Sequence, residues 1–238
     1  MGKTVSEVLI RARTPDAQAT AKCLNDLIVR SNPILVNQAV NQRRKKEKKD
    51  EANYIWPWSP GQRPKMATLT ERYGIKGAVI SAVDLIKGTG IYAGMDVIPV
   101  QGATGLWDTN YEGKADASVK ALQTHDFVYC HVEATDEAGH SKDLDLKIKT
   151  IEYLDQRLVG RILQGLEDTK IEAVVSILPD HATPVEYGNH VKDPVPVAIW
   201  DPKQRPDAVT TFDENSVQKG MLGVMHGKQF IERALARN

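Results

Sequence analysis

The sequence contains few cysteines, few aromatic residues and no excess of charge of either sign. Its two cysteines, Cys23 and Cys130, are too few and too far apart to form a disulfide framework or a zinc clip. Because 31 basic side chains balance 31 acidic ones, no net charge draws the chain toward nucleic acid or an anionic membrane. No apolar run approaches the roughly 18–20 residues that span a bilayer, and residues 1–6 contain no apolar signal core. We therefore expect a soluble cytoplasmic protein with neither a nucleic-acid nor a membrane partner.

The composition changes near residue 65, and we expect a domain boundary there. Before it, residues 17–29 have helical apolar spacing, residues 33–36 form a short strand-like run, and the basic residues 43–46 open an exposed segment. Residues 54–64 hold three prolines and two tryptophans, a composition that excludes a helix or a central strand. This last stretch, residues 54–64, is called the Trp–Pro loop below and is predicted to be rigid.

From residue 66 onward, segments with strand and helix patterns alternate. Strands are expected at residues 77–83, 96–100, 127–133, 173–178 and 195–200. Helices are expected at residues 65–73, 114–124, 143–165, 216–223 and 227–236. The fourth strand is almost continuously apolar, as in sheets covered by helices on both faces. The predicted fold class is therefore α/β, a layered sheet with helices on both faces.

Three histidines lie close to the ends of predicted strands. Asp136 and His140 follow the third strand and are four residues apart, so one helical turn places both on one side. Asp180 and His181 come directly after the fourth strand, at the sheet edge where open α/β folds place their sites. His190 stands just before the fifth strand. Each feature alone is more typical of a turn or a surface histidine, but their joint occurrence predicts a metal site.

The expected ligands are mixed, with carboxylate oxygens and imidazole nitrogens in one set. Calcium prefers oxygen ligands alone, whereas manganese and zinc accept both kinds. The residue types therefore favour Mn²⁺ or Zn²⁺ over Ca²⁺.

Several longer motifs occur in a fixed order along the chain. They are Ala-Thr-Asp-Glu-Ala-Gly-His at 134–140, residues 147–155, Pro-Asp-His-Ala-Thr-Pro at 179–184, His190 with the prolines at 194 and 196, residues 77–88, residues 102–114 and the Trp–Pro loop. From about residue 30 onward, this set closely resembles the cofactor-independent phosphoglycerate mutases, and within them the archaeal-type branch of the alkaline phosphatase superfamily. The resemblance implies an alkaline-phosphatase-like fold and a glycolytic isomerase that interconverts 2- and 3-phosphoglycerate through a phosphoserine intermediate.

The resemblance also implies a two-metal centre. In that family two divalent ions hold a serine nucleophile and the phosphoryl group of the substrate. Carried over to this sequence, Asp136, His140 and His190 would hold one ion, and Asp180 and His181 would hold the other. Mn²⁺ is the expected ion, with Zn²⁺ and Mg²⁺ as alternatives, and the site of this chain could be empty.

Three basic residues are candidates for binding a phosphorylated substrate. A guanidinium group binds carboxylates and phosphates with two parallel hydrogen bonds, so Arg63 in the Trp–Pro loop is the first candidate. Arg44 and Lys76 are further candidates, although each is also compatible with an ordinary surface charge.

The sequence departs from the family pattern at its beginning. In the family, a metal-binding aspartate and then the nucleophilic serine precede an inserted domain, and Ser6, Ser31 and Ser59 stand in no comparable context. We therefore expect the catalytic nucleophile outside this chain and a fold incomplete at its N-terminus. Residues 1–64 would be a remnant of the inserted substrate-side domain with its linker loop, and residues 65–238 the metal-binding phosphatase-like domain. Such a C-terminal part would be inactive alone or would need the missing segment in trans.

Three functions remain open for the parent protein. The first is the mutase. The second is a metal-dependent phosphatase or another phosphotransferase of the same superfamily, which activity on a generic aryl phosphate but not on phosphoglycerate would favour. The third is a non-catalytic truncated module, which a folded, metal-free monomer with only local hydrogen bonds at Asp180 and His181 would favour.

Overall fold

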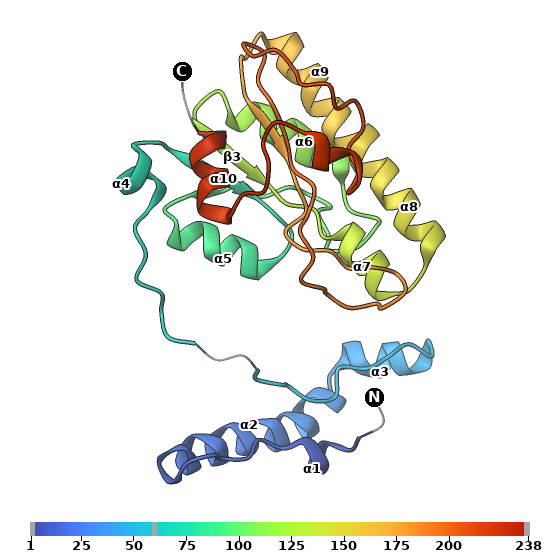
Figure 1. The fold of residues 1–238 in the computed structure, drawn as a ribbon. Helices are drawn as coiled ribbons and strands as arrows, with labels where there is room; N and C mark the ends of the chain where they lie inside the picture. The colour runs from blue at the N-terminus through green and yellow to red at the C-terminus, as the bar shows by residue number, and fades with distance from the viewer. Residues whose placement is uncertain (1–2, 59–60, 236–238) are drawn as a thin grey trace. The chain divides into compact units, whose positions relative to one another are not determined.

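The chain divides into two compact units, residues 1–64 and residues 65–238 (Figure 1). The computed structural model describes residues 3–58 and 61–235, so Ser59 and the end of the predicted helix at 227–236 lie outside the described residues. Within the described residues, no helix combines the length and the apolar character that crossing a membrane requires.

The regular elements in the described part of the first unit are all helical, with no strand. Its elements are the helices α1 (Val5–Val8), α2 (Gln18–Val36) and α3 (Ala39–Lys46), and a 3₁₀ turn, η1 (Pro15–Ala17). The strand predicted at 33–36 is wrong, because these residues form the last turn of α2 with Pro33 inside the helix. A lone apolar run has no second strand to pair with, whereas the helix satisfies its backbone groups locally at the loss of one N–H donor.

The basic residues 43–46 are exposed, as expected, but they form the last turn of α3, where positive charge suits the helix dipole. Asn41 is almost completely buried and joins α3 to its surroundings, because its side-chain amide donates to the carbonyl oxygens of Leu35 at 2.7 Å and Ala52 at 2.6 Å. The described part of the Trp–Pro segment, residues 54–58 and 61–64, contains neither helix nor strand, as predicted.

The second unit is built on a parallel sheet of three strands in the order β2–β1–β3. The strands are β1 (Gly77–Ile80), β2 (Asp96–Val97) and β3 (Phe127–Cys130). β1 is central and wholly buried, and its last residue pairs with the last residue of β3. The connections run through α5 (Asp84–Tyr92) and α6 (Tyr111–Ala121) in opposite directions along the sheet, so right-handed crossovers place these helices on opposite faces. The predicted α/β class with helices on both faces is confirmed.

Helix α5 is an element that the sequence pattern did not predict. It contains two glycines, which weaken a helical pattern, and its Leu85 and Ile91 are exposed. Gly90 is needed there because a Cβ atom would lie 2.6 Å from Cγ1 of Val79 in the central strand. The glycine that weakens the helix in sequence therefore permits its close packing on the sheet.

The last two predicted strands do not join the parallel sheet. β4 (Val175–Ile177) and β5 (Ala198–Trp200) form a separate antiparallel pair. Both are shorter than predicted, and Pro196 lies in the trimmed part of the second one, where it has no N–H to donate to a ladder. The segment between these strands folds back on itself through an antiparallel bridge between Ala182 and Val191.

A long helical layer covers α6. The helix predicted at 143–165 extends to residue 169 and consists of α8 (Leu144–Tyr153), a π-helical segment η2 (Leu154–Val159) and α9 (Gly160–Thr169), which lie in line in Figure 1. The core between this layer and the sheet is formed by Tyr111, Ala115, Ala134 and Leu158. Arg157 of η2 stacks on the rings of Tyr111 and Tyr153, 4.8 Å from each ring centre.

The remaining elements are short, and the helix at residues 134–140 is not among the predicted ones. They are α4 (Leu69–Tyr73), α7 (Ala134–His140), the 3₁₀ turn η3 (Ser216–Lys219) and α10 (Gly227–Ala234). α4 begins at residue 69 rather than 65 because Thr68 and Glu71 form a capping box there. The helix predicted at 216–223 is only the turn η3, which ends at Gly220.

Candidate metal centre

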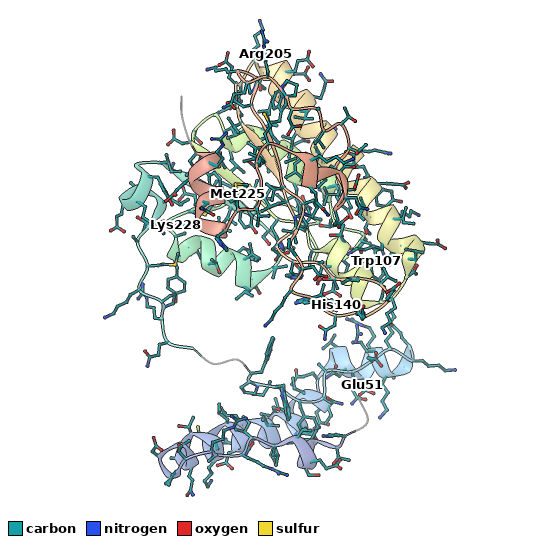
Figure 2. The ribbon with its side chains drawn as sticks, viewed as in Figure 1. Glu51, Trp107, His140, Arg205, Met225 and Lys228 are labelled. Atoms are coloured by element: carbon teal, nitrogen blue, oxygen red, sulfur yellow. The ribbon has the colours of Figure 1, made fainter. Side chains whose placement is uncertain are left out.

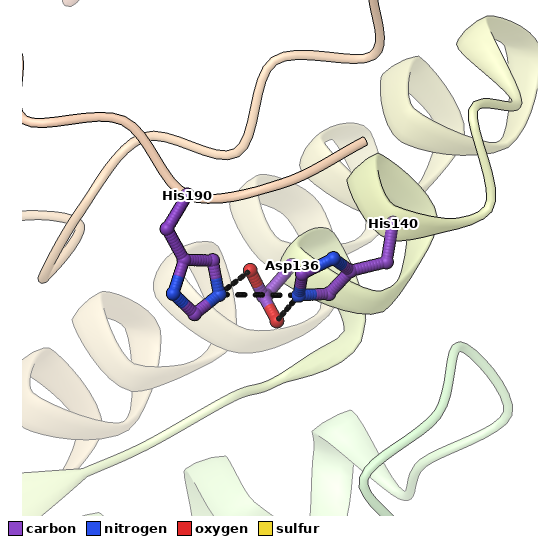
Figure 3. Close-up of side chains that lie close together, drawn as sticks. All are labelled: Asp136, His140 and His190. Atoms are coloured by element: carbon purple, nitrogen blue, oxygen red, sulfur yellow. Dashed lines mark hydrogen bonds and ion pairs between the residues drawn. The ribbon is translucent and has the colours of Figure 1, made fainter. Parts of the chain in front are cut away.

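Asp136 and His140 lie on α7, the short helix that follows β3 at the carboxyl end of the parallel sheet. His190 reaches the same place from the folded-back segment between β4 and β5. Figure 3 shows both imidazole rings directed at the Asp136 carboxylate. Within the second unit, His140 lies at the opposite end from Arg205 (Figure 2). The structure therefore brings three of the predicted ligands together from segments about fifty residues apart, since His140 and His190 are 50 residues apart in sequence.

The three side chains are close enough to share one ion. Nε2 of His140 lies 3.1 Å from Oδ2 of Asp136, and Nε2 of His190 lies 3.4 Å from Oδ1. The two Nε2 atoms are 3.1 Å apart. The aspartate side chain is 19% exposed, and those of His140 and His190 are 33% and 49% exposed, so the cluster is open to small molecules on one side.

The hydrogen bonds of His140 indicate which kind of group can lie between the three side chains. Its Nδ1 lies 3.1 Å from the carbonyl oxygen of Gly188, and a carbonyl only accepts, so Nδ1 carries the proton. In the neutral ring Nε2 is then a bare lone pair facing the carboxylate of Asp136. A proton on one of the two rings or a cation must therefore lie between these atoms, and a divalent ion can bind all three ligand atoms at once. The residues present thus fit a divalent metal of the kind that binds nitrogen and oxygen.

Two glycines permit the approach of the two segments. At Gly139 in α7, a Cβ atom would collide with the backbone carbonyl oxygen of Thr183, so α7 and the 182–191 segment touch at this point. Gly188 adopts a left-handed backbone conformation with φ of +62°, which other residues reach only with strain. Its carbonyl is the one that orients His140, so the conformation of Gly188 contributes directly to the cluster.

Asp180 and His181 lie beside this cluster. The ring of His181 stacks on that of His190 with 3.7 Å between ring centres, and its Nδ1 lies 4.0 Å from Oδ1 of Asp136. Its Nε2 is 3.6 Å from the mostly exposed carboxylate of Asp180. Among the described residues, the groups of three or more side chains that could hold an ion include neither Asp180 nor His181. Asp180 and His181 thus lie next to the cluster and offer two further atoms that could bind a metal ion.

Sequence reasoning missed several polar residues at this edge. Glu133 and Glu137 form a second acidic group with Asp136, and burial together with the nearby carboxylates raises the pKa of Glu133. His131 lies 3.2 Å from the Glu133 carboxylate, and burial lowers the pKa of its imidazole. The alternation His131–Val132–Glu133 at the end of a strand places the two polar residues on one face, a signal that the sequence contained.

Of the substrate candidates, Lys76 lies in the same unit as the cluster but apart from it. Lys76 precedes β1, so it lies at the amino end of the sheet, where its ammonium group is 3.3 Å from Oδ2 of Asp96. The ligand cluster is at the opposite, carboxyl end. Arg44 and Arg63 belong to the first unit, and the Arg44 guanidinium donates to the carbonyl oxygen of Asp50.

Comparison with known proteins assigns this arrangement to a family. The pattern of the metalloenzyme superfamily matches residues 8–232. A relative from Methanosarcina barkeri named 2,3-bisphosphoglycerate-independent phosphoglycerate mutase is 46% identical over 231 residues, which cover 97% of this chain and 56% of the relative. A relative from Geobacter sulfurreducens, named as a probable enzyme of the same kind, is 44% identical over 91% of this chain and 54% of its own length.

Two solved structures agree with the fold. A protein of Pyrococcus horikoshii is similar with a TM-score of 0.79 and 35% identity, covering 93% of this chain and 57% of that one. The cofactor-independent phosphoglycerate mutase of Thermoplasma acidophilum is similar with a TM-score of 0.52 and 28% identity, covering 90% and 50%. The chain spans about half of the length of the curated relatives that it matches, from 52% to 59%.

Proposed function

The chain belongs to the metalloenzyme superfamily, and from that premise we propose that it carries the metal-binding part of a 2,3-bisphosphoglycerate-independent phosphoglycerate mutase. The observation that supports this most is the convergence of Asp136, His140 and His190. These residues occur in a chain whose relatives bear the name of that enzyme. The substrate would be phosphoglycerate, the reaction an isomerisation in glycolysis, and the location the cytoplasm.

Each predicted ligand has a proposed role. Asp136, His140 and His190 would hold one divalent ion, and Asp180 and His181 would contribute two donors to another. Bound divalent ions supply Lewis-acid chemistry: they polarise phosphoryl oxygens and lower the pKa of a hydroxyl nucleophile. The Gly188 carbonyl would keep the His140 ring in the tautomer that presents a lone pair to the ion.

The remaining parts of the proposal concern groups outside this cluster. The serine nucleophile and further ligands would come from a segment outside this chain, supplied in trans if necessary. Residues 65–238 would be the metal-binding domain, and residues 1–64 a part of the substrate-side domain with Arg44 and Arg63 as anion-binding candidates. Lys76 is a weaker candidate because its ammonium group already pairs with Asp96. Mn²⁺ is the proposed ion, with Zn²⁺ and Mg²⁺ as alternatives.

The experiment mixes this chain with the part of the Methanosarcina barkeri relative that lies outside its match. Conversion of 3-phosphoglycerate to 2-phosphoglycerate is followed by ³¹P NMR with Mn²⁺, Zn²⁺ or Mg²⁺. We expect turnover in the mixture, none in the chain alone, and none in a mixture containing Asp136→Asn. Asp145→Asn, which changes an exposed carboxylate of α8, is the matched control and should leave turnover unchanged.

Two results would contradict the proposal. Absence of turnover with every ion, although the chain binds metal at Asp136, would exclude the mutase reaction for this combination. Hydrolysis of p-nitrophenyl phosphate without mutase turnover would instead identify a phosphatase of the same superfamily.

A further inference from the structure

Thr183 connects the two segments that carry the ligands. It is almost completely buried, with 4% of its surface exposed. Its hydroxyl donates to Oδ1 of Asp136 at 2.5 Å, and the same oxygen lies 3.3 Å from Nδ1 of His181. One hydroxyl of the folded-back segment therefore contacts an α7 carboxylate and the imidazole beside it.

Lys147 of α8 makes the second connection. Its ammonium group donates to the carbonyl oxygens of Thr135 at 2.6 Å and of Thr183 at 3.5 Å. Thr135 directly precedes Asp136, so one cation binds the backbone of both ligand-bearing segments. The side chain is half-buried, and this burial lowers the pKa of Lys147. A half-buried ammonium group that is directed at two backbone carbonyls loses solvation, which indicates a specific structural use of the charge.

The contacts converge on one point. α7 and the folded-back segment already touch where Gly139 meets the Thr183 carbonyl, and that carbonyl also accepts from Lys147. Rotation of the Asp136 carboxylate is opposed by the Thr183 hydroxyl, and separation of the two segments is opposed by Lys147.

We propose that Thr183 and Lys147 are positioning residues that hold Asp136 and the His190-bearing segment in metal-binding geometry before an ion arrives. The proposal rests on the metal centre proposed above. Groups that orient metal ligands typically change metal affinity by about 10–100-fold when they are removed. The two residues act on different degrees of freedom, the rotation of one carboxylate and the separation of two segments, so their effects can be measured separately.

The first test is Mn²⁺ titration of the full chain by isothermal calorimetry. Thr183→Val keeps the shape of the side chain and removes the donor, and it should weaken Mn²⁺ binding by about 10–100-fold. Thr183→Ser restores the hydroxyl and should restore the affinity. Thr109→Val is the matched control: Thr109 is buried, and within residues 3–58 and 61–235 its hydroxyl bonds only the backbone N–H of Thr104, so the variant should lose stability without losing affinity.

The second test replaces the lysines. Lys147→Met should weaken Mn²⁺ binding, whereas Lys114→Met should not, although Lys114 is also buried and donates to a backbone carbonyl, that of His131. Thermal unfolding without metal is recorded for every variant. A purely structural role would lower the melting temperature and leave the affinity of the folded fraction unchanged.

A readout without metal separates this proposal from the proposed function. In the metal-free chain, NMR should show contacts between the ring protons of His140 and His190, and Thr183→Val and Lys147→Met should weaken them. If the unchanged chain binds no Mn²⁺ but these contacts respond as expected, the metal centre is refuted and the positioning role stands. If Thr183→Val and Lys147→Met bind Mn²⁺ as tightly as the unchanged chain, the positioning role is refuted and the metal centre stands.

Discussion

Replacing Gly188 by alanine should affect both the stability of the second unit and its metal site. Gly188 has φ of +62°, and a left-handed conformation costs a residue with a side chain about 1–2 kcal/mol. The new Cβ would also lie 2.6 Å from Cε and 2.8 Å from Cγ of Lys142, so that side chain would have to move. We therefore expect a loss of about 1–2 kcal/mol in the free energy of unfolding, together with weaker Mn²⁺ binding, because the shifted carbonyl no longer holds Nδ1 of His140.

Two other glycines separate these effects. Gly223 has φ of +63° and no atom within 4 Å of an added Cβ, so Gly223→Ala carries the same backbone strain away from the cluster. Gly105 has neither a left-handed conformation nor a close neighbour, so Gly105→Ala should be almost neutral. Urea unfolding gives the stabilities and calorimetry the Mn²⁺ affinities. If Gly188→Ala is as stable as Gly105→Ala, the strain argument is wrong. If it binds Mn²⁺ with unchanged affinity, the Gly188 carbonyl does not orient His140.

Two further predictions concern buried polar groups. The Tyr111 hydroxyl is buried and has no hydrogen-bond partner among the described residues, so Tyr111→Phe should not lower the free energy of unfolding in urea and should raise it by up to about 1 kcal/mol; a clear loss would reveal a missed partner. Burial lowers the pKa of Lys114, so between its folded pKa and its ordinary value near 10.4 the unfolded chain binds more protons and stability rises with pH. The free energy of unfolding of Lys114→Met should therefore exceed that of the unchanged chain most at neutral pH, and this difference should shrink toward pH 10. A difference that does not depend on pH would contradict this reasoning.

The parts of the fold that follow local patterns could be predicted from the sequence. The helical pattern of residues 143–165 predicts the long helical layer, and the four-residue spacing of Asp136 and His140 predicts their place on one side of α7. Helix α5 does not follow from the sequence because its two glycines weaken the helical pattern, and the reason for Gly90, its close approach to Val79, is visible only in the structure. The strand at 33–36 was predicted wrongly because a short apolar run does not reveal whether it has a strand to pair with.

The site depends on contacts that local patterns do not contain. His190 reaches Asp136 because a bridge between Ala182 and Val191 folds the segment back, and that pairing joins residues far from α7 in sequence. β4 and β5 pair with each other rather than with the parallel sheet, an arrangement that the apolar strand patterns did not distinguish from a single sheet. Lys76 was selected for its charge, and only its place before β1 shows that it lies at the other end of the sheet.

The most direct test of the metal centre is anomalous X-ray diffraction from crystals of this chain grown with Mn²⁺. We expect one strong anomalous peak bound by the Asp136 carboxylate and by Nε2 of His140 and of His190, and no peak at that place in crystals of Asp136→Asn. A manganese ion bound elsewhere, or these three side chains directed to separate places in the presence of Mn²⁺, would contradict it.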